Sequence, residues 1–582
     1  MRSFFKIFFA SFLALIIFSF FATILLIGII NSLATKSKPE ISNKSVLELD
    51  LNAVFHERKI VNPYASISGE SSAPGVYDVV RLIKNAKNDN KISGIFIRAD
   101  GNANGFATSN EIRNALLDFK TSKKFVLAYG DVITQKAYYV ASAADKIYLN
   151  PKGNFEWKGF AIAFAFLKGT LEKLDIKPQI FYAGKYKSAT EMFRTEQMTS
   201  ENKLQTSVWL NSIYNDFIFK IATSRQIDSS VLRNLANTAA IQTPDDAYNS
   251  RLVDGLRYDD EIKDDLKHRL GLGKTDRINL ISINKYDEAV NLRKSGSERI
   301  ALIYAEGNII DGSGTNETIG GEDYIKIIRK VRLDTKVKAI VLRVNSGGGS
   351  ALASENIWRE LKRARAEGKP VVVSFGDVAA SGGYYISCGA DSIFAQPNTI
   401  TGSIGVFGII PDLGSFFKNK LGITFDGVKT SPYADMGAIY RPLNPGEQQQ
   451  IQKSIERTYM QFKQRVAEGR KKNIEFIDSI AQGRVWIGAD AIKIGLVDKM
   501  GNLQDAIDCA VRLSKVGNYT IKEYPEQESW LDNLLNRRKD EPAATIRNEL
   551  GEENFKLYQQ LIYLKGLAGN AQARLPFEFY IQ

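Results

Sequence analysis

The sequence predicts an α/β protein built from two tandem copies of one domain, behind an N-terminal transmembrane helix. Three observations support this class. Segments far apart in the chain resemble one another at a spacing of about 245 residues. Within each copy, stretches with helical periodicity alternate with apolar, β-branched runs, which is typical of largely parallel sheets. Near the N-terminus, the chain contains a long run without any charge.

The uncharged run covers residues 7–34 and exceeds the roughly 20 residues that a helix needs to cross a bilayer. A cleavable signal has a shorter apolar region of roughly 7–15 residues. Arg2 and Lys6 precede the run and favour a cytoplasmic N-terminus, although two lysines behind it weaken that bias. We therefore expect residues 1–35 to be an uncleaved signal anchor, with the bulk of the chain outside the cytoplasm. Cleavage behind the run stays open as an alternative.

The repeat is a duplicated domain, because its period is far longer than that of a solenoid. Residues 77–100 match residues 322–345, and YGDVITQKAYYVASAADKIYLNP at 129–151 matches FGDVAASGGYYISCGADSIFAQP at 375–397. The predicted organisation is an anchor at 1–35, a first copy at 46–257, a charged linker at 258–298, a second copy at 299–520 and a tail at 521–582. In the tail, an amphipathic helix at 554–567 and an extended end at 573–582 are predicted.

The composition excludes several partners. The net charge is +12, but the basic residues are spread along the chain without a stripe of interleaved aromatic residues, so no nucleic acid is expected. Cys388 and Cys509 lack metal-ligand spacing, and buried free thiols are favoured over a disulfide. Neither a metal nor a cofactor is predicted. The two histidines, His56 and His268, leave few bases for a nucleophile.

Ser381 is the candidate nucleophile. It lies in AASGGYY, between an apolar β-like run and a predicted helix, and the aligned residue of the first copy is Gln135. The second copy also carries a glycine run, Gly347–Gly349, that the first copy lacks. Such a run lets backbone N–H groups approach a substrate carbonyl and hold an oxyanion, although a glycine run alone also fits an ordinary tight turn.

The base is the harder assignment. A Ser-His-Asp triad needs a histidine, but neither histidine lies in a motif with a nearby acid. A buried lysine can serve instead if desolvation lowers its pKa from about 10.4 toward neutrality. In the first copy, Lys185 matches a lysine of the second copy, whereas Lys187 matches Ser431. Each copy has thus kept one partner, which favours Lys187 as the base that meets Ser381 across the interface.

Ser403 is a candidate for orienting the lysine. It lies in TGSIGV, which follows the nucleophile and has no counterpart in the first copy. Its hydroxyl could accept a hydrogen bond from a neutral lysine and aim the lone pair of the amine at Ser381. An ordinary turn serine is the simpler alternative.

The chain resembles the signal peptide peptidase A family, also called protease IV, in its long duplicated form. The resemblance covers residues 46–520 and the anchor, and its motifs are GKYKSA at 184–189, RVNSGGGSALASE at 343–355, AASGGYYIS at 379–387, TGSIGV at 401–406 and GRVWIGADAIKIGLVD at 483–498. It implies tandem domains of the ClpP/crotonase-like fold with a Ser/Lys dyad. It also implies a single-pass protein of the inner membrane with its catalytic domains in the periplasm, a bowl-shaped homotetramer, and released signal peptides as substrates.

The resemblance also implies roles for single residues. These are nucleophile Ser381, general base Lys187, lysine-orienting Ser403, and oxyanion donors among the backbone N–H groups of Gly348, Gly349 and Gly382. The family usually reads Asn-Ser-Pro-Gly-Gly, whereas position 347 is glycine here. Without proline the loop is less rigid, so which N–H group points into the oxyanion hole stays open.

Two other functions fit parts of the pattern. Crotonase-like acyl-CoA hydratases also use glycine-loop oxyanion holes, but typically with acidic residues. A catalytically weak scaffold that binds membrane peptides would be expected to lose its dyad, yet both dyad positions are occupied. The favoured prediction is therefore a membrane-anchored serine endopeptidase that degrades released signal peptides and other apolar peptides.

Overall fold

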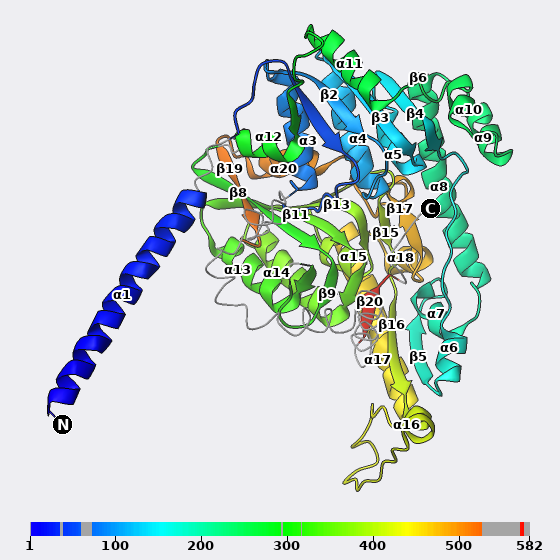
Figure 1. Ribbon diagram of the computed structural model, residues 1–582. Coiled ribbons are helices and arrows are strands. Elements are labelled where there is room, and N and C mark those ends of the chain that lie inside the picture. The colour runs from blue at the N-terminus through cyan, green and yellow to red at the C-terminus, as the bar shows by residue number, and fades with distance from the viewer. Residues whose placement is uncertain are drawn as a thin grey trace.

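Two largely parallel sheets, one from each copy of the repeat, form the centre of the molecule (Figure 1). The computed structural model describes residues 2–34, 39–59, 73–290, 292, 295–315, 317–526 and 571–575. The amphipathic segment predicted at 554–567 lies outside these residues.

The first sheet is parallel throughout its described pairings. Its spatial order is β6 (Gly255–Leu256), β4 (Lys146–Phe155), β3 (Phe125–Ile133), β2 (Ile92–Arg98), β1 (Ser45–Asp50) and β7 (Leu280–Ser282). The central strand β2 reads ISGIFIR, and most of its side chains are buried. A nearly continuous apolar run is what a parallel strand covered on both faces requires.

The second sheet repeats this plan. Its order is β17 (Val485–Ile487), β15 (Ile400–Gly402), β13 (Val371–Ala380), β11 (Val337–Ser346), β8 (Glu298–Glu306) and β19 (Tyr519–Tyr524). Off this path, β14 (Ser392–Ala395) pairs with β13, and β18 (Lys499–Met500) pairs with β14. The unit α3 (Val76–Asn88) and β2 corresponds to α13 (Gly321–Leu333) and β11, and β3 with α5 (Gln135–Ala141) corresponds to β13 with α15 (Gly382–Ser387). The predicted duplicated α/β fold is confirmed.

A third, mixed sheet joins the two copies. Its order is β10 (Thr318–Gly320), β9 (Asn308–Ile310), β12 (Gly348–Ser350), β20 (Gln572–Arg574), β16 (Val406–Asp412) and β5 (Lys177–Ala183). Strand β5 belongs to the first copy and runs antiparallel to β16 of the second, from Lys177 opposite Asp412 to Ala183 opposite Val406. This pairing fixes the position of the chain that follows β5.

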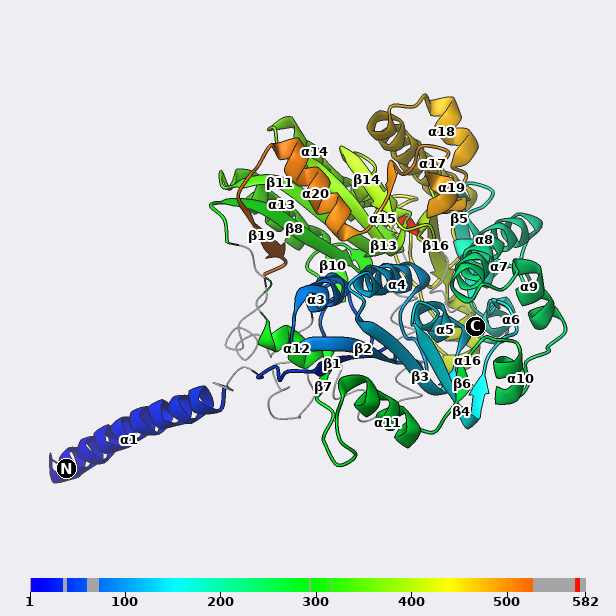
Figure 2. The same cartoon turned by 90° about the horizontal axis from the view of Figure 1, so that it is seen from above.

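The helices cover the faces of these sheets. They are α4 (Phe106–Lys120), α6 (Lys168–Lys173), η1 (Ser188–Thr190), α7 (Glu191–Arg194), α8 (Ser200–Arg225), α9 (Ser229–Asn237), α10 (Pro244–Asn249), α14 (Ala351–Ala366), α16 (Gly414–Leu421), α17 (Pro445–Arg470), α18 (Ile474–Ile480), α19 (Gly488–Ala491) and α20 (Leu503–Ser514), besides those already named. Helices α3 and α4 lie between the first sheet and the second copy (Figure 2). Tyr77 of α3 is part of one buried cluster with Leu302 and Val341 of the second sheet.

As predicted, Cys388 and Cys509 are buried free thiols.

The charged segment 258–298, predicted as a linker, carries regular structure. It contains α11 (Asp259–Leu270), β7 and α12 (Ile283–Ala289). Strand β7 pairs in parallel with β1 and so extends the first sheet at its edge. The connection between the copies is therefore packed against the first of them.

Helix α1 (Arg2–Ala34) stands apart from the rest of the molecule (Figure 1). Its stretch Lys6–Ile24 has a mean hydropathy of 2.5, and none of it is buried against the protein. By length and composition this helix could cross a membrane, a test that an N-terminal signal sequence would also pass.

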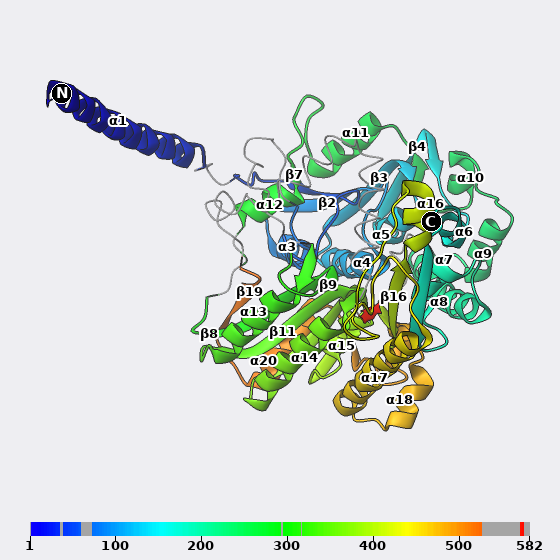
Figure 3. The same cartoon turned by 90° about the horizontal axis from the view of Figure 1, so that it is seen from below.

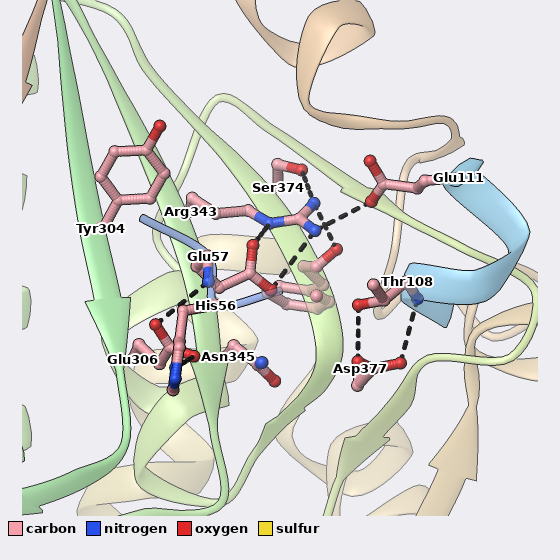
Figure 4. A network of polar contacts seen from close by, with 12 residues as sticks. His56, Glu57, Thr108, Glu111, Tyr304, Glu306, Arg343, Asn345, Ser374 and Asp377 are labelled. Atoms are coloured by element: carbon pink, nitrogen blue, oxygen red, sulfur yellow. Dashed lines mark hydrogen bonds and ion pairs between the residues drawn. The ribbon is translucent and has the colours of Figure 1, made fainter. Parts of the chain in front are cut away.

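A buried ionic cluster connects the two copies (Figure 4). The Arg343 guanidinium of β11 lies 2.6 Å from Glu57 and 2.8 Å from Glu111, and both carboxylates come from the first copy. All three side chains are at most 2% exposed. Burial raises the pKa of Glu57 to about 7 and also raises that of Glu111, while the guanidinium opposes both shifts. The two carboxylates therefore depend on one cation supplied by the other copy.

Asp377 of β13 makes a second connection by capping α4 of the first copy (Figure 4). Its carboxylate accepts hydrogen bonds from the N–H groups of Ala107 and Thr108, at 2.8 and 3.0 Å. A Cβ atom at Gly105 would lie 2.2 Å from the Asp377 side chain, so only glycine leaves room for this cap. The first turn of α4 thus receives its capping carboxylate from the second copy.

The ionic cluster yields a stability prediction. An Arg343→Leu substitution would leave two carboxylates buried without a cation, a loss that typically costs about 3–5 kcal/mol of unfolding free energy. We expect a clearly lower urea midpoint of unfolding. The matched control is Arg329→Leu, which removes a 52% exposed arginine from Glu360, a carboxylate that Arg332 and Arg363 also contact. The control should cost less than about 1 kcal/mol, and equal effects of the two substitutions would contradict the bridging role.

Candidate active site

Ser381 lies at the turn between β13 and α15. Its backbone has φ 54° and ψ −114°, which is strained for a residue with a side chain. The residue is fully buried, and its N–H donates to the Gly402 carbonyl at 2.8 Å. A Cβ atom at Gly383 would lie 2.6 Å from the Ser346 carbonyl, so the helix can begin this close to β11 only with glycine there. The sequence thus builds a sharp turn with the serine at its apex.

The structure brings Lys187 of the first copy to Ser381 of the second. Lys187 follows β5 by four residues and is 1% exposed. Its Nζ atom lies 2.9 Å from Oγ of Ser381. The same Nζ donates to Oγ of Ser403 at 3.1 Å and to the Ser403 carbonyl at 3.3 Å. Three residues that are far apart in the sequence therefore meet within hydrogen-bonding distance.

The surroundings of this lysine favour its neutral form. Burial lowers the pKa of Lys187 from 10.5 to about 7, and it is the sole cause of that shift. A nearby carboxylate would have opposed the shift. The Phe407 ring, centred 6.0 Å from Nζ, adds an apolar neighbour. A neutral amine has two hydrogens for Ser403 and one lone pair that can accept the hydroxyl proton of Ser381.

Two glycines leave room for the lysine. At Gly483 (φ 75°), a Cβ atom would lie 2.7 Å from the Lys187 backbone nitrogen, and at Gly405 it would lie 3.1 Å from Lys187 Cδ. The neighbouring Tyr186 N–H donates to the Gln482 carbonyl at 2.8 Å, which holds this loop against the second copy. Nothing in the sequence marks either glycine as a neighbour of the lysine, although both lie inside the motifs TGSIGV and GRVWIG.

The other candidates of the sequence lie elsewhere. Lys185 is exposed, with Nζ 5.2 Å from the centre of the Tyr186 ring. Gln135, which stands at the position of Ser381, accepts hydrogen bonds from the N–H groups of Lys158 and Gly159 with its side-chain oxygen. His56 pairs with Glu306 at 3.3 Å in the network of Figure 4. In the first copy, the position of the nucleophile is thus taken by the side-chain amide of Gln135, which binds the backbone.

The glycine run borders the turn of Ser381. Gly348 has φ 99°, and a Cβ atom there would lie 2.5 Å from the Gly382 nitrogen. A Cβ atom at Gly349 would lie 1.9 Å from the Ile309 carbonyl, so neither position accepts a side chain. The Gly348 N–H donates to Oγ of Ser346 at 3.1 Å. Because that donor is engaged, Gly349 and Gly382 are better placed than Gly348 to offer N–H groups to a substrate carbonyl.

Comparison with protein families matches peptidase family S49 twice. The two matched regions are residues 118–273 and residues 363–517. Each region covers the turn that carries Gln135 in one copy and Ser381 in the other. The family match thus follows the same duplication as the fold.

Relatives with long coverage carry protease names. Protease 4 of Salmonella typhi is 36% identical over 92% of this chain and 88% of its own length. Protease 4 of Haemophilus influenzae is 37% identical over 82% of this chain and 80% of its own. The chloroplastic serine protease SPPA of Arabidopsis thaliana is 34% identical over 77% and 67%.

Among solved structures, ClpP1 from Listeria monocytogenes aligns with 34% of this chain and 91% of its own length, at 18% identity and a TM-score of 0.23. The twofold family match and the long-coverage relatives settle the family. The chain belongs to peptidase family S49 and is a serine protease.

Proposed function

We propose that this protein is a membrane-anchored serine endopeptidase in which Ser381 is the nucleophile and Lys187 is the general base. The observation that carries the proposal is the 2.9 Å approach of a buried lysine, whose pKa burial lowers to about 7, to a strained, buried serine. A scaffold without catalysis would not need to bury a lysine without a counterion, which costs free energy of folding. The scaffold alternative is therefore not favoured.

In the proposed mechanism, neutral Lys187 accepts the proton of Ser381 while Oγ attacks the peptide carbonyl carbon. The resulting ammonium gives a proton to the leaving amine, and an ester links Ser381 to the acyl part. The amine then activates a water molecule that hydrolyses the ester. Ser403 positions the lysine by accepting a hydrogen bond from its amine, so that the lone pair of the amine points to Ser381.

The oxyanion of the tetrahedral intermediate is assigned to backbone N–H groups from Gly382 and the glycine run. The side-chain-free Gly348 allows the two peptide segments to approach each other. Of the two candidate donors in the run, we assign Gly349, because the Gly348 N–H bonds to Ser346. Fixed backbone donors of this kind lower the barrier without reorganising during the reaction.

The proposed substrates are signal peptides already released from their proteins, and other apolar peptides. The apolar strand β16 borders the site, and α1 would hold the protease at a membrane surface. With Arg2 and Lys6 at the N-terminal end of α1, we assign the anchor to the inner membrane and the catalytic body to the periplasmic side. This arrangement would keep the catalytic site in the compartment that borders the outer face of the membrane.

A homotetramer is the proposed assembly. The end of α16 and the segment behind it project from the body in Figure 1 and lie in front of it in Figure 3. They expose Leu421, Ile423, Phe425 and Val428. Contiguous exposed apolar side chains are typical of interfaces between subunits. Light scattering of the detergent-solubilised protein would test the assembly directly.

The dyad predicts activity and its pH dependence. Lys187→Met and Ser381→Ala should each lower kcat/KM on a quenched apolar peptide at least about 10³-fold. In the parent protein, kcat/KM should rise with pH through about 7 and then level off, because protonated Lys187 cannot accept a proton. Lys185→Met, two residues away and exposed, is the matched control and should retain activity. A limb that rises only near pH 10 would show that the base is not a desolvated lysine.

The positioning role of Ser403 predicts a shift of the same pH limb. Ser403→Ala removes an acceptor that stabilises the ammonium more than the neutral amine, so the limb should move to lower pH. Without the positioning contact, kcat/KM at the plateau should fall about 10–100-fold. The control is Thr401→Val, which removes a buried hydroxyl that donates instead to the Ala379 carbonyl. It should leave the limb in place, and an unmoved limb in Ser403→Ala would refute the positioning role.

A further inference from the structure

The side chain of Gln205 connects the loop of Lys187 to the second copy. Gln205 lies in the second turn of α8 and is 2% exposed. Its Nε2 atom donates to the Tyr186 carbonyl and to Oγ of Ser188, both at 3.1 Å. Its Oε1 atom accepts a hydrogen bond from the N–H group of Val485 in β17 at 3.1 Å. One amide therefore binds the residues before and after Lys187 together with a strand of the other copy.

The backbone at Lys187 forms a tight turn that this amide holds from outside. The Ser188 N–H donates to the Tyr186 carbonyl at 2.8 Å, and Lys187 has φ −75° and ψ 75°. These angles are close to those of an inverse γ-turn, which has a single internal hydrogen bond. The position of such a turn depends on contacts with its surroundings. Gln205 supplies one contact to each end of the turn.

Strand β17, at the other end of the amide, also supports the two serines of the site. It pairs antiparallel with β15, where Val485 lies opposite Gly402. The Gly402 carbonyl accepts the N–H group of Ser381 at 2.8 Å. The carbonyl of Arg484, directly before β17, accepts the N–H group of Ser403 at 2.7 Å. The turn of the lysine is thus attached to the same strand that supports the nucleophile and the orienting serine.

The neighbours of Gln205 fix the orientation of its amide. The Val485 N–H group can only donate and the Tyr186 carbonyl can only accept, so the two ends of the amide cannot be exchanged. Asn202, one turn earlier in α8, accepts a further hydrogen bond from Nε2 at 3.3 Å, and its own amide donates to the Glu191 carboxylate at 2.9 Å. Glu191 and Asn202 are each 2% exposed. An unbroken chain of hydrogen bonds therefore leads from a buried carboxylate to the turn of the lysine.

The place of the lysine amine depends on where its backbone is held. Nζ of Lys187 reaches the hydroxyl groups of Ser381 and Ser403 at 2.9 and 3.1 Å, at the end of a flexible four-carbon stem. A misplacement of about 1 Å at a reacting group can cost about 10²-fold in rate. Ahead of the lysine, the Tyr186 N–H is bound to a carbonyl of the second copy. On the other side of the turn, Gln205 makes the corresponding attachment.

We propose that Gln205 is a positioning residue of the Ser/Lys dyad, which holds Lys187 at the distance from Ser381 that proton transfer requires. The inference rests on the proposed function, because it assigns the support of the proposed base. Gln205 does not touch the reacting atoms and acts through the backbone on both sides of the lysine. Loss of its contacts would free the turn and let the amine move toward water.

The test measures how fast a fluorophosphonate probe labels Ser381 as a function of pH, in full-length protein in detergent. Gln205→Met keeps the length of the side chain and removes its hydrogen bonds. Labelling at the plateau should fall about 10–100-fold. The limb should move to higher pH, because a lysine that reaches water regains its ordinary pKa of about 10.4, whereas burial lowers the pKa of Lys187 to about 7. On a quenched peptide, kcat should fall while KM changes little.

Thr206→Val is the matched control. Thr206 is the next residue of α8 and is 5% exposed. In the described part of the chain, its hydroxyl donates to the side-chain oxygen of Asn202 at 3.3 Å and not to the lysine turn. Any loss in this variant should appear in the urea midpoint of unfolding and not in the limb or the plateau. Ser188→Ala is a second test variant, which removes one acceptor of Gln205 and should move the limb in the same direction by a smaller amount.

The outcomes separate this inference from the proposed function. An unmoved limb and plateau in Gln205→Met would overturn the positioning role and leave the dyad standing. A plateau that falls only in proportion to the folded fraction, with the limb in place, would do the same. If Gln205→Met does not fold, an unmoved limb in Ser188→Ala decides against the role. A limb that moves to lower pH, as expected for Ser403→Ala, would also overturn it. Labelling that persists in Lys187→Met would overturn the Ser/Lys mechanism itself.

Discussion

The candidate site depends on a lysine whose pKa is lowered by burial next to a serine from another part of the chain. Burial alone lowers the pKa of Lys187 to about 7, and a carboxylate close to it would raise that pKa again. The protein therefore has to hold the two copies together without placing charged side chains beside Lys187 and Ser381. It does so by separating the two tasks. The strands β5 and β16 bring the lysine in through backbone pairing, while Arg343 and Asp377 provide the charged contacts elsewhere on the interface.

The same constraint explains why the copies have diverged. In the proposed mechanism the reactive pair lies between the copies, so a second serine or a second lysine would have no partner. The turn of the first copy is closed by the Gln135 side chain, which binds the backbone of Lys158 and Gly159. The second copy has Ser431 at the position of Lys187, in an exposed segment. In the proposed site, each copy thus contributes one residue of the dyad and supports the residue that the other copy contributes.

The sequence was most informative where duplication provides an internal comparison. The fold class followed from the repeat, and the proximity of Ser381 and Lys187 followed from which residue each copy lacks. Several features that neither the repeat nor a local pattern marks were not predictable. Glu57 lies in an irregular segment, so no periodicity marks it as a buried ion. Gly405 and Gly483 matter only through their distance from a lysine more than 200 residues away. Strand β7 lies in a segment whose charge favours a linker, and the three residues of β20 are too few to carry a periodic pattern.

The place filled by β20 has a consequence for what can enter it. The slot between β12 and β16 has strand edges on both sides, so an occupant must offer backbone hydrogen-bonding groups along both of its own edges. A helix has already used those groups internally, and a strand within a folded sheet has used at least one edge. Entry therefore requires a chain segment that has no secondary structure of its own at that moment. Discrimination between a discarded peptide and an intact protein can then arise from conformation alone, since the folded protein would first have to unfold locally, at a free-energy cost that the peptide does not bear.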